Sequence, residues 1–341
     1  MLAVSAPRGP RLATATAIAA VGALAAIVLA VLFGSETTSV HRAWADPAGL
    51  DGTILLRLRA PRVAVAALAG GGLAAAGAAL QALLRNPLAE PYVLGVSGGA
   101  ALGATAALLA GLGGVAWFGA GLVPLAAFLG GVAATALVAR FVRRGTLRGE
   151  GILLAGFVVN ALASAAITLA KTIVDANRAQ ELLFWLTGFV DVPTSGELLA
   201  LAAGVLVGVA GLVRLAPALG HLAFGDDVAE SLGIDVPRVE RQTLLLASLV
   251  TGSIVAVTGL VAFVGLVVPQ VLRRLVGSDP RKLVPLSFFA GAGLLPLCDL
   301  ASRLAVRLFH TGPPVGAITA LLGGPVFLVL LLREKRERDV A

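Results

Sequence analysis

Long apolar runs without a charged residue constrain the fold of this 341-residue chain more than any other feature. Val63 to Leu84 carries no charge and is bounded by Arg62 and Arg85. About 20 consecutive apolar residues cross the hydrocarbon core of a bilayer as a helix, so this run predicts one membrane span. Pro61 suits the first turn of that helix. The helix ends before Asn86-Pro87, because a proline excludes the preceding residue from helical geometry.

The other runs bring the prediction to ten transmembrane helices. Val93 to Ala139 is too long for one span and predicts two, with a bend at Gly111 to Gly114. Pro269 divides the run from Gln242 to Leu272 into a long seventh helix and a short eighth. The ten predicted spans lie at 12–33, 63–84, two within 93–139, 152–170, 198–213, two within 242–272, 283–306 and 314–332.

Composition supports the same fold class. The chain is 58% hydrophobic and 13% charged, with a mean hydropathy of +0.96, which leaves too little polar surface for a soluble globule. We therefore expect an all-α polytopic membrane protein in which residues 1–341 form a single transmembrane domain. The first run follows Arg8 and Arg11 as in a signal peptide. It exceeds the usual apolar length of about 7 to 15 residues, and we interpret it as an uncleaved span.

The basic residues predict the orientation. Alternating the loops of ten spans places 18 of the 26 Lys and Arg on the side of both termini, so the positive-inside rule puts the termini in the cytoplasm. The net charge of +7 is explained by this loop topology and by contact with lipid, rather than by nucleic acid. Eight basic residues remain on the outer side: Arg42, Arg57, Arg59, Arg62, Lys171, Arg178, Arg303 and Arg307.

Several kinds of chemistry are excluded by what the sequence lacks. The longest polar connections are too short to hold a catalytic domain, and no G-x-x-x-x-G-K-[ST] motif is present to cradle a phosphate. Cys298 is the single cysteine, and His41, His221 and His310 are too scattered for a metal site. We expect no enzyme activity, no cofactor and no metal in this chain. If ATP and Mg²⁺ drive it, they bind to another chain.

Two patterns allow a different class of transporter. Asp299 is the one acidic residue at membrane depth, and Arg303 lies four residues later, the spacing of an ion pair on one helix face. We favour a structural pair over a proton relay. Gln81-x3-Arg85-x4-Glu90-Pro91 recurs as Gln270-x3-Arg274-x4-Asp279-Pro280, a repeat that chance also explains. An ion-coupled secondary transporter and a non-transporting scaffold are the alternatives that these patterns leave open.

Several motifs spread along the chain resemble those of the FecCD permeases, the membrane subunits of ABC importers for ferric siderophores, haem and cobalamin. They are Arg59-Ala60-Pro61-Arg62, Gln81, Arg85-Asn86-Pro87-Leu88-Ala89, Pro91, Leu94-Gly95-Val96-Ser97, Gly99-Ala100, residues 229–234, residues 263–273 and residues 314–327. Ala60 departs from the family, which usually has Leu there. Gly95, Gly99 and Gly103 also recur every fourth residue, which favours close approach of a neighbouring helix.

The resemblance implies the fold of a type II ABC importer permease and a defined set of partners. Two copies, or a copy and a paralogue, would form the pathway in the bacterial cytoplasmic (inner) membrane and work by alternating access. Two ABC ATPase subunits and a periplasmic or lipoprotein substrate-binding protein would complete the importer. A ferric siderophore is the expected cargo, with haem and cobalamin as alternatives.

A cytoplasmic segment at about 220–241 is the candidate for coupling to the ATPase. Asp226, Asp227 and Glu230 lie in a first helical turn, where the helix dipole favours negative charge, and Gly233 suits the helix end. An ordinary solvated connector is the alternative. The resemblance implies that the coupling residues are Asp227, Ala229, Glu230, Leu232 and Gly233.

The arginines on the outer side are the candidates for docking. Arg59 and Arg62 flank Pro61 at a helix start, where cations oppose the helix dipole, so some other group must favour them. Lipid headgroups are one such group. The resemblance implies that Arg59, Arg62 and Arg303 instead receive acidic residues of the substrate-binding protein.

The resemblance implies a translocation path between two copies, lined largely by the fifth and tenth spans. Asn160, Ser164 and Thr168 recur every four residues and form a polar stripe on one helix face, which suits either a water-lined wall or helix packing. The loop from Gly145 to Gly151 precedes this helix and contains three glycines. The resemblance implies that its residues Thr146, Leu147 and Arg148 form the cytoplasmic gate.

Overall fold

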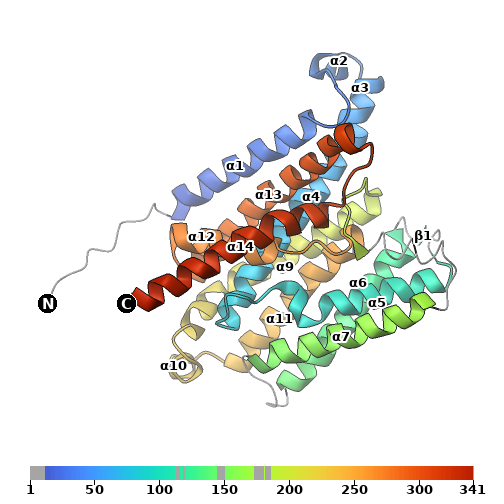
Figure 1. Ribbon diagram of the computed structural model, residues 1–341. Helices are drawn as coiled ribbons and strands as arrows, with labels where there is room; N and C mark the ends of the chain where they lie inside the picture. Colours follow the sequence, from blue (N-terminus) through green and yellow to red (C-terminus); the bar gives the residue numbers. More distant parts are fainter. Residues whose placement is uncertain are drawn as a thin grey trace.

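The computed structural model describes residues 12–112, 116–117, 120–143, 150–172, 180 and 186–340. Its helices run side by side in one bundle (Figure 1). They are α1 (Leu12–Leu32), α2 (Val40–Ala45), α3 (Leu50–Gly52), the π-helical η1 (Thr53–Arg59), α4 (Ala60–Leu83), the 3₁₀ turn η2 (Pro91–Leu94), α5 (Val96–Leu109), α6 (Leu122–Arg143), α7 (Glu150–Thr172), α9 (Ser195–Leu222), α10 (Asp226–Ser231), α11 (Val236–Thr258), α12 (Val264–Val276), α13 (Pro280–Phe309) and α14 (Val315–Val340). A two-residue strand β1 (Ala116–Trp117) pairs antiparallel with β2 (Ala120–Gly121).

The all-helical prediction is confirmed, and each predicted span coincides with one helix. Among the described residues, seven helices are long and apolar enough to cross a membrane by themselves. α5 and the apolar part of α14 are shorter, and α12 has 13 residues. At one end of the bundle lie α2 and α3, and at the other lie α10 and the end of α14 (Figure 1).

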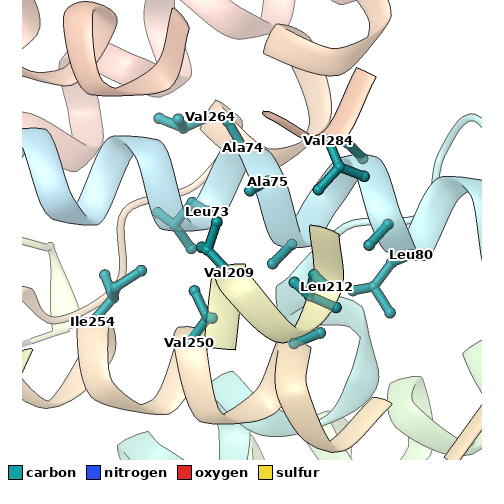
Figure 2. Packing of buried hydrophobic residues seen from close by; sticks show 14 of the residues in the cluster. Leu73, Ala74, Ala75, Leu80, Val209, Leu212, Val250, Ile254, Val264 and Val284 are labelled. Carbon is teal, nitrogen blue, oxygen red and sulfur yellow. The ribbon is translucent and has the colours of Figure 1, made fainter. Parts of the chain in front are cut away.

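Helix α4 lies at the centre of the bundle, where its many glycines and alanines let neighbouring backbones approach closely. Its backbone touches two neighbours: a Cβ on Gly70 would overlap the Gly291 carbonyl of α13, and a Cβ on Gly77 would overlap the Gly265 carbonyl of α12. Between these contacts, buried side chains of α4 interlock with those of four neighbouring helices, α9, α11, α12 and α13 (Figure 2). Those labelled in the figure are Leu73, Ala74, Ala75, Leu80, Val209, Leu212, Val250, Ile254, Val264 and Val284.

The division between the seventh and eighth spans lies earlier than predicted. The chain breaks at Gly259 to Phe263, where Gly259 and Phe263 both adopt a positive φ, 65° and 70°. Pro269 instead lies inside α12. A proline there leaves the Gly265 carbonyl without its helical N–H donor. The buried Gln81 amide lies 3.5 Å from that carbonyl and 3.3 Å from the next, which explains why the helix tolerates the proline.

Two further expectations differ from the structure. The sixth span, predicted at 198–213, extends as α9 to Leu222 and holds both Arg214 and Pro217 within the helix. Gly99 and Gly103 do admit a close neighbour, since a Cβ on either would overlap the backbone of α6. Gly95 does not share that face, because it precedes the helix with φ +83° and faces Val159 of α7.

Candidate functional site

The predicted coupling segment contains a short helix, α10, with exposed apolar residues at both of its ends. Phe224 and Leu232 are largely exposed, whereas Ala229 is fully buried against the neighbouring helices. The N–H groups of Gly233 and Ile234 donate to the carbonyls of Glu230 (2.9 Å) and Ala229 (3.1 Å), which closes the helix with a left-handed glycine at φ +80°. Asp227 and Glu230 are exposed. The five predicted coupling residues therefore lie together on one small projection.

An ion pair joins this projection to the end of α4. The Arg85 guanidinium binds the Asp226 carboxylate, and both side chains are partly exposed. Arg85 itself adopts a positive φ of 49°, so the backbone turns sharply as it leaves α4. The sequence predicted that the helix dipole favours the negative charge of Asp226. Its pairing with Arg85, 141 positions earlier, is visible only in the structure.

The connection from Arg85 to Gly95, between α4 and α5, is bound along its length to the break between α11 and α12. Gln270 Nε2 donates to the Pro87 carbonyl (2.8 Å). Glu90 accepts the Phe263 N–H (2.8 Å), and Tyr92 Oη accepts the Val261 N–H (3.1 Å). Burial raises the pKa of Glu90, which lies in this connection outside the helices, and the Phe263 hydrogen bond opposes that shift. The backbone N–H groups of Val261 and Phe263, which the break leaves without helical partners, thus have side-chain acceptors in this connection.

Asn160 attaches α7 to the same connection. Its Nδ2 donates to the Tyr92 carbonyl (2.8 Å), and its Oδ1 accepts the N–H of Gly98 (2.9 Å) and the hydroxyl of Ser97 (3.3 Å). A predicted path residue therefore also holds the start of α5 against α7. The roles of Glu90 and Tyr92 were missed, because hydrogen bonds to distant backbone groups leave no periodic pattern in the sequence.

The three predicted path residues border one cavity of about 290 Å³. Ser164 and Thr168 are exposed on α7, and the Thr168 hydroxyl donates to the Ser164 carbonyl (2.8 Å). The described residues that line the cavity are Ser97, Gly98, Ala101, Asn160, Ser164, Ile167, Thr168, Lys171, Leu186 and Leu260. The stripe thus borders this cavity, while Asn160 also packs against the start of α5.

The arginines predicted to dock a binding protein have internal partners. Arg62 donates to one oxygen of Asp299 through two nitrogens, at 2.8 and 3.0 Å, and Arg303 donates to the other oxygen at 2.9 Å. Asp299 is fully buried. The predicted pairing of Asp299 with Arg303 is present, and Arg62 is a second cation on the same carboxylate.

The same cluster holds the C-terminal end of α1. Arg303 also donates to the carbonyls of Ala30 (2.7 Å) and Phe33 (3.0 Å). Arg59 donates to the Leu32 carbonyl (3.0 Å), and Arg307 to those of Gly34 (2.9 Å) and Ser35 (2.8 Å). Cations at a helix C-terminus satisfy its free carbonyls and its dipole. This explains why arginines gather at the start of α4.

Docking of a binding protein by Arg59, Arg62 and Arg303 stays a prediction. Arg59 is 5% exposed and Arg303 is 8% exposed, whereas the Arg62 side chain is 24% exposed. Of the three, Arg62 is therefore the most accessible to a partner. The predicted gate residues Thr146, Leu147 and Arg148 lie outside the described part of the chain.

Two other cavities are apolar. One of about 380 Å³ lies between α6, α9 and α11, and one of about 100 Å³ lies between α12, α13 and α14. Within the described ranges, no three His, Cys, Asp or Glu side chains gather where they could hold a metal ion.

Comparisons with known proteins agree with this architecture. The family model of the FecCD transport family matches residues 22–333. The vitamin B12 import system permease protein BtuC of Vibrio cholerae is 39% identical over 315 residues, which are 91% of each chain. The iron(3+)-hydroxamate import system permease protein FhuB of Bacillus subtilis is 36% identical over 319 residues, covering 90% of this chain and 80% of that protein.

A solved structure resembles this chain over nearly its whole fold. A putative metal-chelate type ABC transporter, solved in an inward-facing conformation, superposes with a TM-score of 0.82 at 26% identity and covers 94% of this chain and 99% of that one. The motifs around Arg59, Arg85 and Gly95, the helical bundle and the family match all agree. This chain belongs to the FecCD transport family and is a permease subunit of an ABC importer.

Proposed function

We propose that this permease carries ferric siderophores across the bacterial cytoplasmic membrane by alternating access between two copies of the chain. A permease of this family works with an ATPase and a substrate-binding protein. In our proposal two ATPase subunits bind the cytoplasmic side at α10, and the binding protein delivers cargo to the outer side. A paralogue in place of the second copy gives the same pathway. Both termini lie in the cytoplasm.

The observation that carries the proposal is the continuous chain of contacts from α10 to the polar cavity. Asp226 binds Arg85 at one end of the connection, and Tyr92 binds Asn160 at the other. Between them, Glu90 and Tyr92 hold the break that precedes α12. These bonded groups give a displacement of α10 by an ATPase a continuous route to the wall of the cavity, and this route is what supports coupling.

The contacts of Asp299 weigh against ion-coupled transport. A proton relay needs a carboxylate that gains and loses its proton during the cycle. Asp299 instead has a guanidinium hydrogen-bonded to each of its oxygens, which leaves neither oxygen open to a proton path. The ionisable group predicted at membrane depth thus has a structural role in this protein.

The relatives support three classes of cargo. FhuB is named for an iron(3+)-hydroxamate, which supports a ferric siderophore. BtuC is named for vitamin B12 and is similar to this chain to the same degree, so cobalamin is the second candidate. A haemin transport permease of Yersinia pestis is also similar to this chain, so haem is a third candidate.

Uptake by reconstituted vesicles tests the proposal. The permease, its ATPase and its binding protein are reconstituted together, and ATP-dependent accumulation of a ferric siderophore, haem and cobalamin is measured. We expect accumulation of the iron chelate alone. Accumulation of cobalamin alone would establish the second candidate, and accumulation driven by a proton gradient without ATP would overturn both.

A further inference from the structure

We propose that Lys171 selects for anionic cargo at the polar cavity beside α7. The inference rests on the proposed function, since it names the charge class of the iron chelate that the permease carries. Lys171 was noted in the sequence only as one of eight basic residues on the outer side. The structure places it on the wall of the cavity that Asn160, Ser164 and Thr168 border.

Lys171 lies at one end of this wall of the cavity. It lies in the last turn of α7, which ends at Thr172, so in the predicted orientation it stands at the outer end of the polar stripe. The stripe then descends along the helix through Thr168 and Ser164 to Asn160. Cargo released by a binding protein on the outer side would meet the ammonium first and the hydroxyls afterwards.

The charge of the cavity is not balanced within the described part of the chain. Its described lining residues include one ammonium, two serines, one threonine and one asparagine, but no carboxylate. The Lys171 side chain makes no hydrogen bond or ion pair to another described residue. A cation that faced hydrocarbon here would be costly. Water and an anionic ligand are the surroundings that satisfy the ammonium.

The iron chemistry divides the possible cargo by charge. Three hydroxamates neutralise Fe³⁺, so a trihydroxamate complex is close to neutral at its core. Catecholate and citrate donors bring more negative charge than Fe³⁺ cancels, and their complexes are anions. An ammonium with hydroxyl and amide neighbours favours the second group through charge-assisted hydrogen bonds and long-range attraction. We therefore assign anionic catecholate or carboxylate chelates to this permease in preference to neutral hydroxamates.

Charged thiol reagents measure this selectivity without knowledge of the cargo. Ser164→Cys places a thiol on the stripe, and Cys298 is too buried to interfere. In the reconstituted importer, the rates of reaction with an anionic and a cationic methanethiosulfonate are compared at low salt. Each rate is divided by the rate of the same reagent with a free thiol. We expect the resulting ratio of the anionic to the cationic rate to be roughly five. Adding Lys171→Gln should bring this ratio to about one, and Lys171→Arg should leave it unchanged.

Two results would overturn the inference. Equal ratios in the Ser164→Cys protein with and without Lys171→Gln would show that Lys171 does not set the potential of the cavity. No reaction with either reagent in any transport state would show that the stripe does not line an aqueous path.

A transport measurement separates this inference from the proposed function. With one binding protein held constant, Lys171→Gln should lower the maximal uptake rate of ferric citrate about tenfold and leave the apparent affinity for the loaded binding protein unchanged. Wild-type uptake of ferric citrate that is unaffected by the substitution would refute the role of Lys171 while upholding iron import. Absence of ATP-dependent uptake of any iron chelate by the wild type would refute the proposed function itself.

Discussion

Arg62 of α4 and Asp299 of α13 are joined by two hydrogen bonds to one carboxylate oxygen, while Arg303 occupies the other oxygen. Two helices are thereby fixed to each other, near the start of α4 and the end of α13, through a fully buried anion. Because Arg303 and Arg59 also bind the end of α1, the cluster joins three helices. The arginines at the start of α4 thus have a structural role, whether or not a partner also uses them.

Asp299→Asn should destabilise the permease markedly. The substitution removes the anion and leaves Arg62 and Arg303 without a counter-charge, a change that costs about 3–5 kcal/mol in buried pairs. The unfolding midpoint in detergent measures the loss. Arg42→Gln is the matched control, because the Arg42 side chain is 72% exposed in its pair with Asp51 and its loss should cost about 1 kcal/mol or less. Equal midpoints for the two variants would contradict the structural role of the cluster.

Arg62→Gln should also slow association of the substrate-binding protein, if the docking prediction holds. Arg62 is the most exposed of the three predicted docking residues, and charges at the rim of an interface act mainly on the association rate. Stopped-flow mixing at low and high salt measures the effect, which should shrink as salt rises. Arg42→Gln serves again as the control, since it removes one outer charge without touching the cluster. The same slowing in both variants would assign the effect to net charge alone.

Leu232→Ser should detach the ATPase while leaving the permease folded. Leu232 is exposed at the end of α10, so its loss costs no internal packing, but a partner groove would lose an apolar contact. Ala229→Leu should act differently, because Ala229 is fully buried and a larger side chain there distorts α10 itself. Copurification of the ATPase and the thermal midpoint distinguish the two effects. A Leu232→Ser protein that keeps its full complement of ATPase would show that α10 is a simple connector.

Gly77→Ala should prevent stable folding even though it adds a single methyl group. The new Cβ would overlap the Gly265 carbonyl, which belongs to another helix and cannot move away alone. Gly22→Ala is the control: no atom lies within 4 Å of its added Cβ, and alanine favours helix by up to about 1 kcal/mol. The yield of monodisperse protein after extraction measures both. Normal yield of Gly77→Ala would mean that α4 and α12 are farther apart than described.

Leu50→Cys should react with an impermeant thiol reagent in intact cells, and Arg336→Cys should not. Leu50 is 79% exposed in the segment between α1 and α4, which the orientation places outside. This site is preferable to the neighbouring Asp51, whose side chain is paired with Arg42 and largely covered. Arg336 lies near the C-terminus on the predicted cytoplasmic side. Labelling of Arg336→Cys from outside would reverse the orientation and the sides assigned to docking and coupling.

The spans were predictable because the residues that define each one are neighbours in the sequence. Val63 to Leu84 needs no distant residue to identify it as a helix, since its length and bounding arginines are enough. Gly233 likewise marks a helix end by a backbone requirement of its own, and the structure gives it a positive φ. Its importance comes from that backbone conformation, because open space surrounds the position where a side chain would lie.

The partners of the polar groups were not predictable in the same way. Pro269 looked like the division between two helices, since nothing in the sequence near it shows that Gln81 of α4 lies by the carbonyl it frees. Gln81 and Gln270 were matched as a possible repeat, and the structure shows them hydrogen-bonded to each other over 2.9 Å. Asn160 was placed on a path from its spacing, but its bonds to Tyr92 and Gly98 depend on how α7 meets η2 and α5.

The burial of α4 divides the permease into a stationary part and a part that can move. Helices whose backbones touch, as α4 does with α12 and α13, cannot shift against each other without opening voids along their length. α7 is mostly exposed, and Asn160 ties it through side-chain hydrogen bonds to the connection and to α5. We therefore expect transport to proceed by rocking of the α5–α7 layer against a fixed block built around α4. A compound that wedges between these two bodies would arrest the cycle without unfolding either one.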